Sequence, residues 1–348
     1  MAAPQDWLDC AKIDPELDQF IQKKMGGKPP KLGGTIPGLR VQLAQAKAAL
    51  NAAQGPADTT GIREKDITIE ARDGYSIPAR IHAPERSHAD GGPLVVILHG
   101  GGWCLGGLEN EELNCRNFAQ QLGCVCVNVD YRLAPEHVFP AAVNDSWDAL
   151  KWAATNAKSL GAEPQKGFIV GGTSAGGNLA SIMALLARDE QLSPRLTGVL
   201  LLIPALLDPT VVPEKHRPSY QSYEQNKDAP VLPVSALTLF KANYKPEVSS
   251  PLYSPILHPK GHGSLPPFYF QVCGMDPLRD EALIYEKILR EEYAVSTKLD
   301  VYQGVPHAFW SFFPALKVSM RFVEDTVKGM TWLLQQGRKE DKISAKLV

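Results

Sequence analysis

Short continuous apolar runs recur along this chain, with helical stretches between them. The runs are Leu94–Leu98, Val125–Val129, Phe168–Val170, Val199–Ile203 and Phe268–Val272. A strand that is apolar on both faces needs cover on both faces, and helices between successive strands supply it in a parallel sheet. Alternating segments on either side of Asp73-Gly74 predict an antiparallel hairpin before these runs. The sequence therefore predicts an α/β protein with a mostly parallel central sheet flanked by helices.

Two segments do not follow this alternation. Residues 1–60 contain two helical stretches, and Asp14-Pro15-Glu16 is a start signal for the first. Residues 205–263 are rich in proline and aromatic residues, and a long insertion between core strands is usually functional. We predict one core made of residues 61–204 and 264–348. The two other segments either simply cover this core or form a lid over the site.

The segment Gly172-Thr173-Ser174-Ala175-Gly176 lies between the apolar run that ends at Val170 and the helical stretch 178–188. A strand that turns abruptly into a helix needs small residues, because Cβ atoms would collide there. The serine at the apex is then held on a strained turn with its hydroxyl exposed. At ordinary glycine frequency, roughly one chain in ten of this length contains such a pattern by chance. The pattern therefore predicts a nucleophile only if its partners are present.

Candidate partners follow in the expected order. A serine hydroxyl attacks an acyl group only when a base takes its proton and a carboxylate orients that base. Asp276 follows one apolar run, and His307 follows the next strand-like segment. Asp280 and Glu281 are rival carboxylates, but both lie inside the next helical stretch. We predict Ser174 as the nucleophile, His307 as the base and Asp276 as the orienting carboxylate.

The tetrapeptide His99-Gly100-Gly101-Gly102 directly follows the first apolar run. Three glycines let backbone N–H groups converge on a bound oxygen with no side chain in the way. We predict that the N–H groups of Gly101, Gly102 and Ala175 form an oxyanion hole. His99 is expected to brace the loop rather than to act as a base.

Composition limits the partners of the chain. Apolar residues at 44% and charged residues at 21% are typical of a soluble globular protein. A formal net charge of −2 gives no electrostatic reason to expect nucleic acid or an anionic membrane. No apolar run approaches the ~18 residues that a membrane span needs, and no signal core precedes Cys10. We predict no nucleic-acid partner, no integral membrane segment and a cytoplasmic location, and scattered cysteines agree with a reducing compartment.

No cofactor and no metal are predicted. The chain lacks a phosphate-cradling motif and a dinucleotide motif in a strand–helix–strand setting. His258 and His262 have the spacing of a metal pair on a helix, but Pro259 would break that helix. Cys124 and Cys126 share one face of a predicted strand, where a zinc pair is the alternative to buried free thiols. Buried free thiols are favoured.

Four motifs together resemble the hormone-sensitive lipase family of esterases. They are HGGGW at 99–103, DYRLAPE at 130–136, GTSAGGN at 172–178 and DPLRDE at 276–281. The resemblance runs from about residue 65 to the C-terminal helical stretch. It implies an α/β-hydrolase fold, a helical cap made of residues 1–60 and 205–263, and the triad roles given above. Thr173 departs from the family, which usually has Asp there, and this affects fine substrate preference rather than hydrolysis.

The expected activity is hydrolysis of short- to medium-chain acyl esters through an acyl-enzyme intermediate, with a small-molecule ester as substrate. A non-catalytic ligand binder on this fold is an alternative, but such relatives lose the base. A lyase such as a dehydratase is another, against which the intact serine elbow argues. Many members of the family are dimers, so a homodimer is possible. The acyl pocket is expected to be walled by Trp103, Leu206, Tyr220, Phe240, Phe309 and Trp310.

Overall fold

The computed structural model describes residues 4–55, 57–86 and 90–344. Its centre is an eight-stranded sheet in the order β1-β2-β4-β3-β5-β6-β7-β8. β1 and β4 pair antiparallel with β2, and every other neighbouring pair is parallel. The predicted mostly parallel α/β sheet is confirmed. The strands are β1 Ile62–Glu70, β2 Ser76–Pro84, β3 Leu94–Leu98, β4 Val125–Val129, β5 Phe168–Thr173, β6 Gly198–Leu202, β7 Phe268–Cys273 and β8 Thr297–Tyr302.

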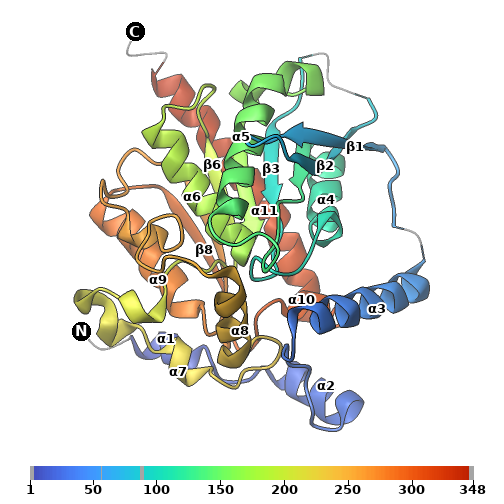
Figure 1. Ribbon diagram of the computed structural model, residues 1–348, viewed down its shortest axis with the longest axis vertical. Coiled ribbons are helices and arrows are strands. Elements are labelled where there is room, and N and C mark those ends of the chain that lie inside the picture. The colour runs from blue at the N-terminus through green and yellow to red at the C-terminus, as the bar shows by residue number, and fades with distance from the viewer. Residues whose placement is uncertain (1–3, 56, 87–89, 345–348) are drawn as a thin grey trace.

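Helices cover both faces of this sheet (Figure 1). α5 (Ala141–Leu160), α6 (Ala175–Asp189) and α9 (Arg279–Lys287) pack on one face. α4 (Glu112–Leu122) and α11 (Lys317–Ser344) pack on the other. In the helical stretch predicted to hold Asp280 and Glu281, the α-helical part ends at Lys287 and a π-helical turn follows. Shorter elements connect the layers: η1 Leu108–Asn110, η2 Pro164–Lys166, π-helix η6 Ile288–Glu292 and α10 Phe309–Phe312.

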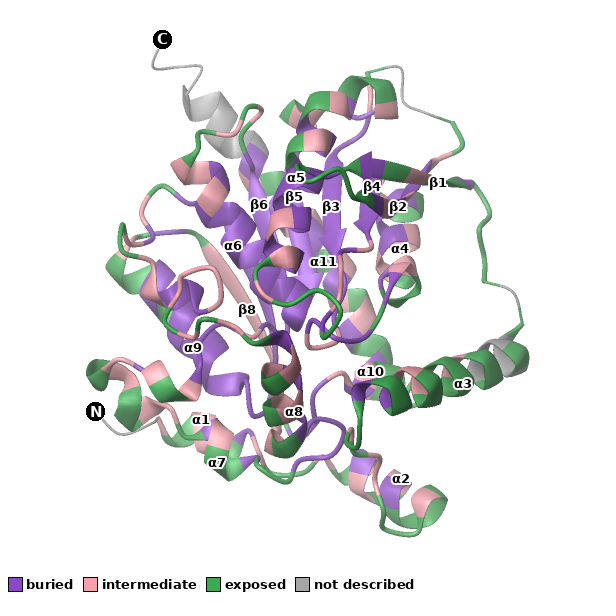
Figure 2. Cartoon of the chain, in the orientation of Figure 1, coloured by how far each residue is buried: buried purple, intermediate pink, exposed green. Residues whose placement is uncertain are grey.

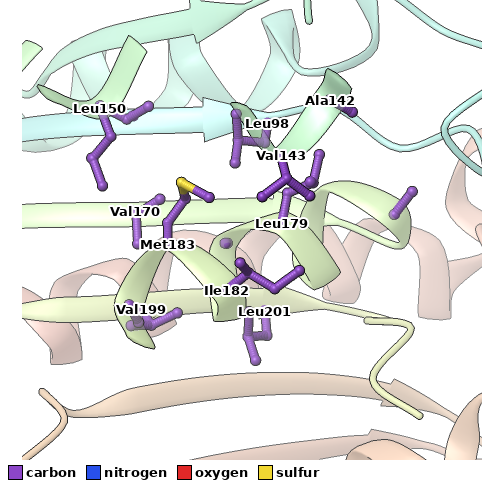
Figure 3. Close-up of a cluster of buried hydrophobic side chains, with 14 of the residues drawn as sticks. Leu98, Ala142, Val143, Leu150, Val170, Leu179, Ile182, Met183, Val199 and Leu201 are labelled. Atoms are coloured by element: carbon purple, nitrogen blue, oxygen red, sulfur yellow. The ribbon is translucent and has the colours of Figure 1, made fainter. Parts of the chain in front are cut away.

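The core beside Ser174 lies between β3, β5 and β6 on one side and α5 and α6 on the other (Figure 3). Val170 of β5 lies beside Met183 of α6, Leu201 of β6 lies beside Ile182 of the same helix, and all four side chains are buried. Burying a side chain of this size contributes about 1.5–3 kcal/mol relative to leaving it exposed. α6 is therefore held firmly against the sheet, which fixes the place of its first residue.

Residues 4–54 and the helices of the 205–263 insertion gather beyond the carboxyl ends of the parallel strands, in the lower part of Figure 1. The two segments pair through Leu32 and Val231: Leu32 N–H donates to Val231 O at 2.8 Å, and Val231 N–H donates to Pro30 O at 2.6 Å. Their elements are α1 Gln5–Asp9, α2 Pro15–Met25, α3 Ile36–Gln54, η3 Pro209–Val211, η4 Glu214–Ser219, α7 Ser222–Gln225, α8 Val234–Tyr244 and η5 Pro255–Leu257.

The two longer N-terminal helices, α2 and α3, differ in how they are held. α2 begins where expected, because the Asp14 carboxylate accepts hydrogen bonds from the N–H groups of Glu16 and Leu17. α3 is exposed along most of its length (Figure 2), and among its described side chains only Ile36 and Leu39 are buried. Within the described residues, no helix combines the length and apolarity that crossing a membrane requires.

Candidate active site

Ser174 stands at the sharp turn between β5 and α6. Its backbone has φ 57° and ψ −113°, a conformation that strains any residue with a side chain. Both neighbouring strands hold the turn, because Leu98 of β3 pairs with Gly172 and Ser174 N–H donates to Leu202 O of β6 at 2.8 Å. A Cβ on Gly176 would collide with the carbonyl oxygen of Leu98. The small residues of the motif are thus required by the close packing of backbone on backbone.

The three predicted triad residues meet at one edge of the sheet. Ser174 Oγ lies 2.9 Å from His307 Nε2, and His307 Nδ1 lies 2.6 Å from Asp276 Oδ2. The residues follow β5, β8 and β7, whose carboxyl ends share that edge. Their relative exposures are 9%, 6% and 1% for Ser174, His307 and Asp276. The arrangement gives the hydroxyl a base and gives the base a buried carboxylate partner.

The rival carboxylates are occupied elsewhere. Asp280 Oδ2 accepts the N–H groups of Gln221 and Ser222 at 2.7 and 2.6 Å. Glu281 accepts the N–H groups of Leu206 and Leu207 at 3.1 and 3.0 Å. Both therefore anchor the 205–263 insertion to α9. Neither forms a hydrogen bond with the histidine.

The loop after β3 presents free N–H groups beside Ser174. Gly101 and Gly102 have φ of 127° and 59°, in the region that favours glycine. Among the described residues, no hydrogen bond uses the N–H of either glycine. The N–H of Ala175, the first residue of α6, belongs to the first helical turn, where N–H groups lack intrahelical acceptors. His99 is fully buried, with Nδ1 2.8 Å from Gly100 O, as expected for a bracing residue.

A cavity of about 1770 Å³ opens over the serine. Five of the six predicted pocket residues line it: Trp103, Leu206, Tyr220, Phe240 and Trp310. Phe309 does not. It is fully buried beneath the site, with its ring 5.5 Å from that of Phe322 and 6.0 Å from that of Tyr302. The cavity exceeds the roughly 300–1,000 Å³ usual for small-molecule sites.

Sequence reasoning missed several residues at this site. Asn178 Nδ2 donates to Ala205 O and Tyr253 O, both at 2.7 Å, and so ties the serine helix to the insertion. The Tyr131 hydroxyl donates to His99 O at 2.6 Å, which supports the glycine loop from below. Both residues lie inside the motifs at 172–178 and 130–136, so the motifs marked them without revealing their partners. Nothing in the pattern indicated that Arg40 and Lys47 of α3 reach the cavity.

Comparison with known proteins agrees with this geometry. Residues 95–311 match a family model described as the alpha/beta hydrolase fold. This chain belongs to the α/β-hydrolase family. Because esterases are named among its relatives and its structural neighbours, it is a carboxylesterase-like hydrolase at the level of the family.

Two relatives and one solved structure illustrate the similarity within the α/β-hydrolases. The AB hydrolase superfamily protein B1A11.02 of Schizosaccharomyces pombe is 41% identical, over 95% of this chain and 96% of that protein. The versiconal hemiacetal acetate esterase of Dothistroma septosporum is 34% identical, over 95% of each. The crystal structure of vibralactone cyclase has a TM-score of 0.85 at 32% identity, and the match covers 94% of this chain and 97% of that one.

The buried carboxyl of Glu111, near Thr173, makes the stability of this hydrolase depend on pH in a predictable direction. Glu111 is 2% exposed and accepts a hydrogen bond from Asn114 Nδ2 at 2.7 Å. Burial raises the pKa of Glu111 above its ordinary 4.5, and the nearby Thr173 hydroxyl opposes that rise. The folded protein therefore keeps this proton at pH values where the unfolded chain has lost it. Its contribution to stability falls as pH rises from about 4.5 through the folded pKa.

We expect Glu111→Gln to flatten this part of the pH profile. The amide cannot ionise, so the free energy of unfolding should fall less between pH 5 and pH 8 than in the wild type. Urea unfolding at several pH values measures the difference. The exposed Glu109→Gln on the same segment is the matched control and should keep the wild-type profile. A Glu111→Gln profile parallel to the wild type would contradict this account.

Proposed function

We propose that this chain is a serine carboxylic-ester hydrolase that works through an acyl-enzyme intermediate. The observation that carries the proposal is the hydrogen-bonded chain from Ser174 Oγ through His307 to Asp276 Oδ2. The open cavity above Ser174 supports it, because an ester must reach the hydroxyl. The four sequence motifs further support placing the chain among the hormone-sensitive lipase group of α/β-hydrolases.

The proposed reaction has two halves. Ser174 Oγ attacks the ester carbonyl carbon while His307 Nε2 accepts the hydroxyl proton, and Asp276 stabilises the resulting imidazolium. The N–H groups of Gly101, Gly102 and Ala175 stabilise the oxyanion. Collapse of the intermediate breaks the bond to the alcohol, which leaves with the proton from His307. Water then attacks the acyl-serine with the same base, and the acid is released as Ser174 regains its proton.

We propose that residues 1–60 and 205–263 form a cap over this site. Their position beyond the carboxyl ends of the strands supports this, as do the hydrogen bonds that join them at Leu32 and Val231. A cap would shelter the acyl-enzyme and limit the acyl chain to short or medium length. The name of the Dothistroma septosporum relative describes an esterase acting on an acetate, which agrees with a short acyl group.

A chain-length series with covalent trapping tests this proposal. We expect turnover of p-nitrophenyl esters with two to eight acyl carbons and a fall of about tenfold or more for chains of twelve or longer. Treatment with a fluorophosphonate should add one phosphonyl group, which peptide mass spectrometry would locate on Ser174. No hydrolysis by the wild type would contradict the proposal and favour a non-catalytic binder. Elimination without hydrolysis would favour a lyase.

The cytoplasmic location and the homodimer remain proposals. Support for the first is that all six cysteines are free and buried, as suits a reducing compartment. Cell fractionation tests the location, and light scattering during gel filtration tests the dimer.

A further inference from the structure

One part of the cavity lining groups polar side chains from the 205–263 insertion and α9, and we call it the polar end. It consists of Asp208, Tyr220, Tyr223, Lys241 and Glu281, with Lys241 bonded to Asp208 and the Tyr220 hydroxyl 3.5 Å from Glu281 Oε2. Other lining residues, among them Leu206 and Phe240, are apolar and suit a hydrocarbon chain. A plain fatty acyl chain that reached Lys241 and Asp208 would have to cover charged groups without satisfying them, which is unfavourable.

Several hydrogen bonds hold Asp208 in place at the polar end of the cavity. Its side chain is 1% exposed, and its Oδ1 accepts the N–H and the hydroxyl of Thr210. Its own N–H donates to Ser254 Oγ at 3.1 Å, and that hydroxyl donates to Val248 O. Hydrogen bonds to the main chain and to the side chain of Asp208 therefore both hold it in place. Two residues earlier, the N–H of Leu206 donates to Glu281 and fixes the same segment.

The ammonium group of Lys241 has N–H donors that its ion pair with Asp208 does not use. Its Nζ lies 3.0 Å from Asp208 Oδ2, and among the described residues Asp208 is the one acceptor within hydrogen-bonding distance. An ammonium group has three N–H donors. The side chain is 34% exposed and lines the cavity, so its remaining donors are available to a molecule bound there. Tyr223 of α7 also lines the cavity and adds a hydroxyl.

Lys241 and Asp208 form an ion pair in which the two charges offset each other. Burial raises the pKa of the neighbouring Glu281 carboxyl well above its ordinary value. A carboxylate on the substrate would meet the negative charge of Asp208 as well as the ammonium. A neutral oxygen needs only the spare donors. The end of the cavity therefore fits a carbonyl or hydroxyl oxygen better than an anion.

We propose that Asp208, Lys241 and Tyr223 form a subsite that selects esters carrying a neutral oxygen group, a ketone or hydroxyl, away from the scissile bond. This inference rests on the proposed ester hydrolysis and names its substrate class. Lys241 acts as the donor to that oxygen, and Asp208 positions Lys241.

Matched ester pairs test this subsite. In each pair one methylene becomes a carbonyl at constant chain length. Acid-side pairs are p-nitrophenyl hexanoate with 5-oxohexanoate, and heptanoate with 6-oxoheptanoate; an alcohol-side pair is hexyl acetate with 5-oxohexyl acetate. We expect wild-type kcat/KM to favour the oxo ester by about tenfold in at least one pair, because a hydrogen bond from a charged donor is worth about that factor.

Variants assign the preference to the subsite. Lys241→Met should bring the oxo/alkyl ratio to about one, whereas Lys241→Arg keeps donors and should retain part of it. Because Lys241→Met leaves a buried carboxylate unpaired, the double variant Asp208→Asn/Lys241→Met removes both charges and should lose the preference equally. Lys151→Met is the control: Lys151 also pairs with a buried aspartate, Asp148, at 3.3 Å, but lies outside the cavity and should keep the wild-type ratio.

The possible results distinguish a failure of the proposed subsite from a failure of the proposed ester hydrolysis. Ratios near one in every wild-type pair would overturn the subsite while leaving hydrolysis of the alkyl esters intact. A preference that survives in both Met-containing variants would also overturn it. If the wild type hydrolyses none of the esters, it is the proposed hydrolase activity that fails, and the subsite falls with it.

Discussion

Replacing Ser174 with alanine is expected to lower kcat for p-nitrophenyl butyrate by about 10⁴-fold or more. The hydroxyl is the one group placed to attack, 2.9 Å from His307 Nε2. Without it the proposed acyl-enzyme cannot form, and only the proposed oxyanion stabilisation and binding remain. Initial rates, corrected for uncatalysed hydrolysis, measure the loss. KM should change much less than kcat, because the cavity is otherwise the same.

Two further variants sharpen this test. Ser181→Ala removes another buried hydroxyl from the same helix, away from the histidine, and should stay within about twofold of the wild type. Asp276→Asn should alone cost about 10⁴-fold, since His307 Nδ1 loses its carboxylate partner. Combined with Ser174→Ala it should cost little more, because residues that act as a unit are not additive. Undiminished turnover by Ser174→Ala would refute the assignment of the nucleophile.

The sheet was predictable because its strands appear in the sequence as short continuous runs of apolar residues. Strands buried on both faces are apolar at almost every position, as in Leu94–Leu98, where all five residues are apolar and buried. The same logic located the site, because groups that follow parallel strands share one edge of the sheet. Ser174, Asp276 and His307 needed no knowledge of side-chain direction, only their places after β5, β7 and β8.

What the sequence did not reveal depends on side-chain direction within irregular segments. Phe309 and Trp310 are adjacent in the short helix α10, so their side chains point in different directions: Trp310 lines the cavity and Phe309 is buried beside Phe322. No periodicity distinguishes the two in so short a helix. Likewise, the polar end of the cavity brings Asp208 to Lys241 across a proline-rich insertion whose path follows no repeating pattern.

The exposed position of α3 could not be predicted from the sequence either. Residues 1–60 are predicted to add cover or a lid, yet among the described residues of α3 only the N-terminal half packs against the core, through the buried Ile36 and Leu39 and the partly buried Leu43. Arg40 then pairs with Glu136 and donates to Cys104 O and Ala134 O. Long-range polar contacts of this kind place the helix, and they cannot be read from local spacing.

Gly176→Ala is expected to have the second largest effect, on stability as well as activity. A Cβ at this position would collide with the carbonyl oxygens of Leu98 and His99, which are main-chain atoms and cannot rotate away. The strand end or α6 must therefore move. We expect the free energy of unfolding to fall by about 3 kcal/mol or more, at the upper end of overpacking costs. Urea denaturation measures this change.

The same displacement should lower activity even in the molecules that stay folded. Leu98 and His99 lead directly into Gly101 and Gly102, so a shift there moves the proposed oxyanion donors, each worth about 10²-fold or more in kcat. Gly33→Ala is the matched control, because no atom lies within 4 Å of its added Cβ, and it should unfold within about 0.5 kcal/mol of the wild type. If Gly176→Ala matched Gly33→Ala in both stability and kcat, the close packing of the nucleophile turn against β3 would not be what fixes the site.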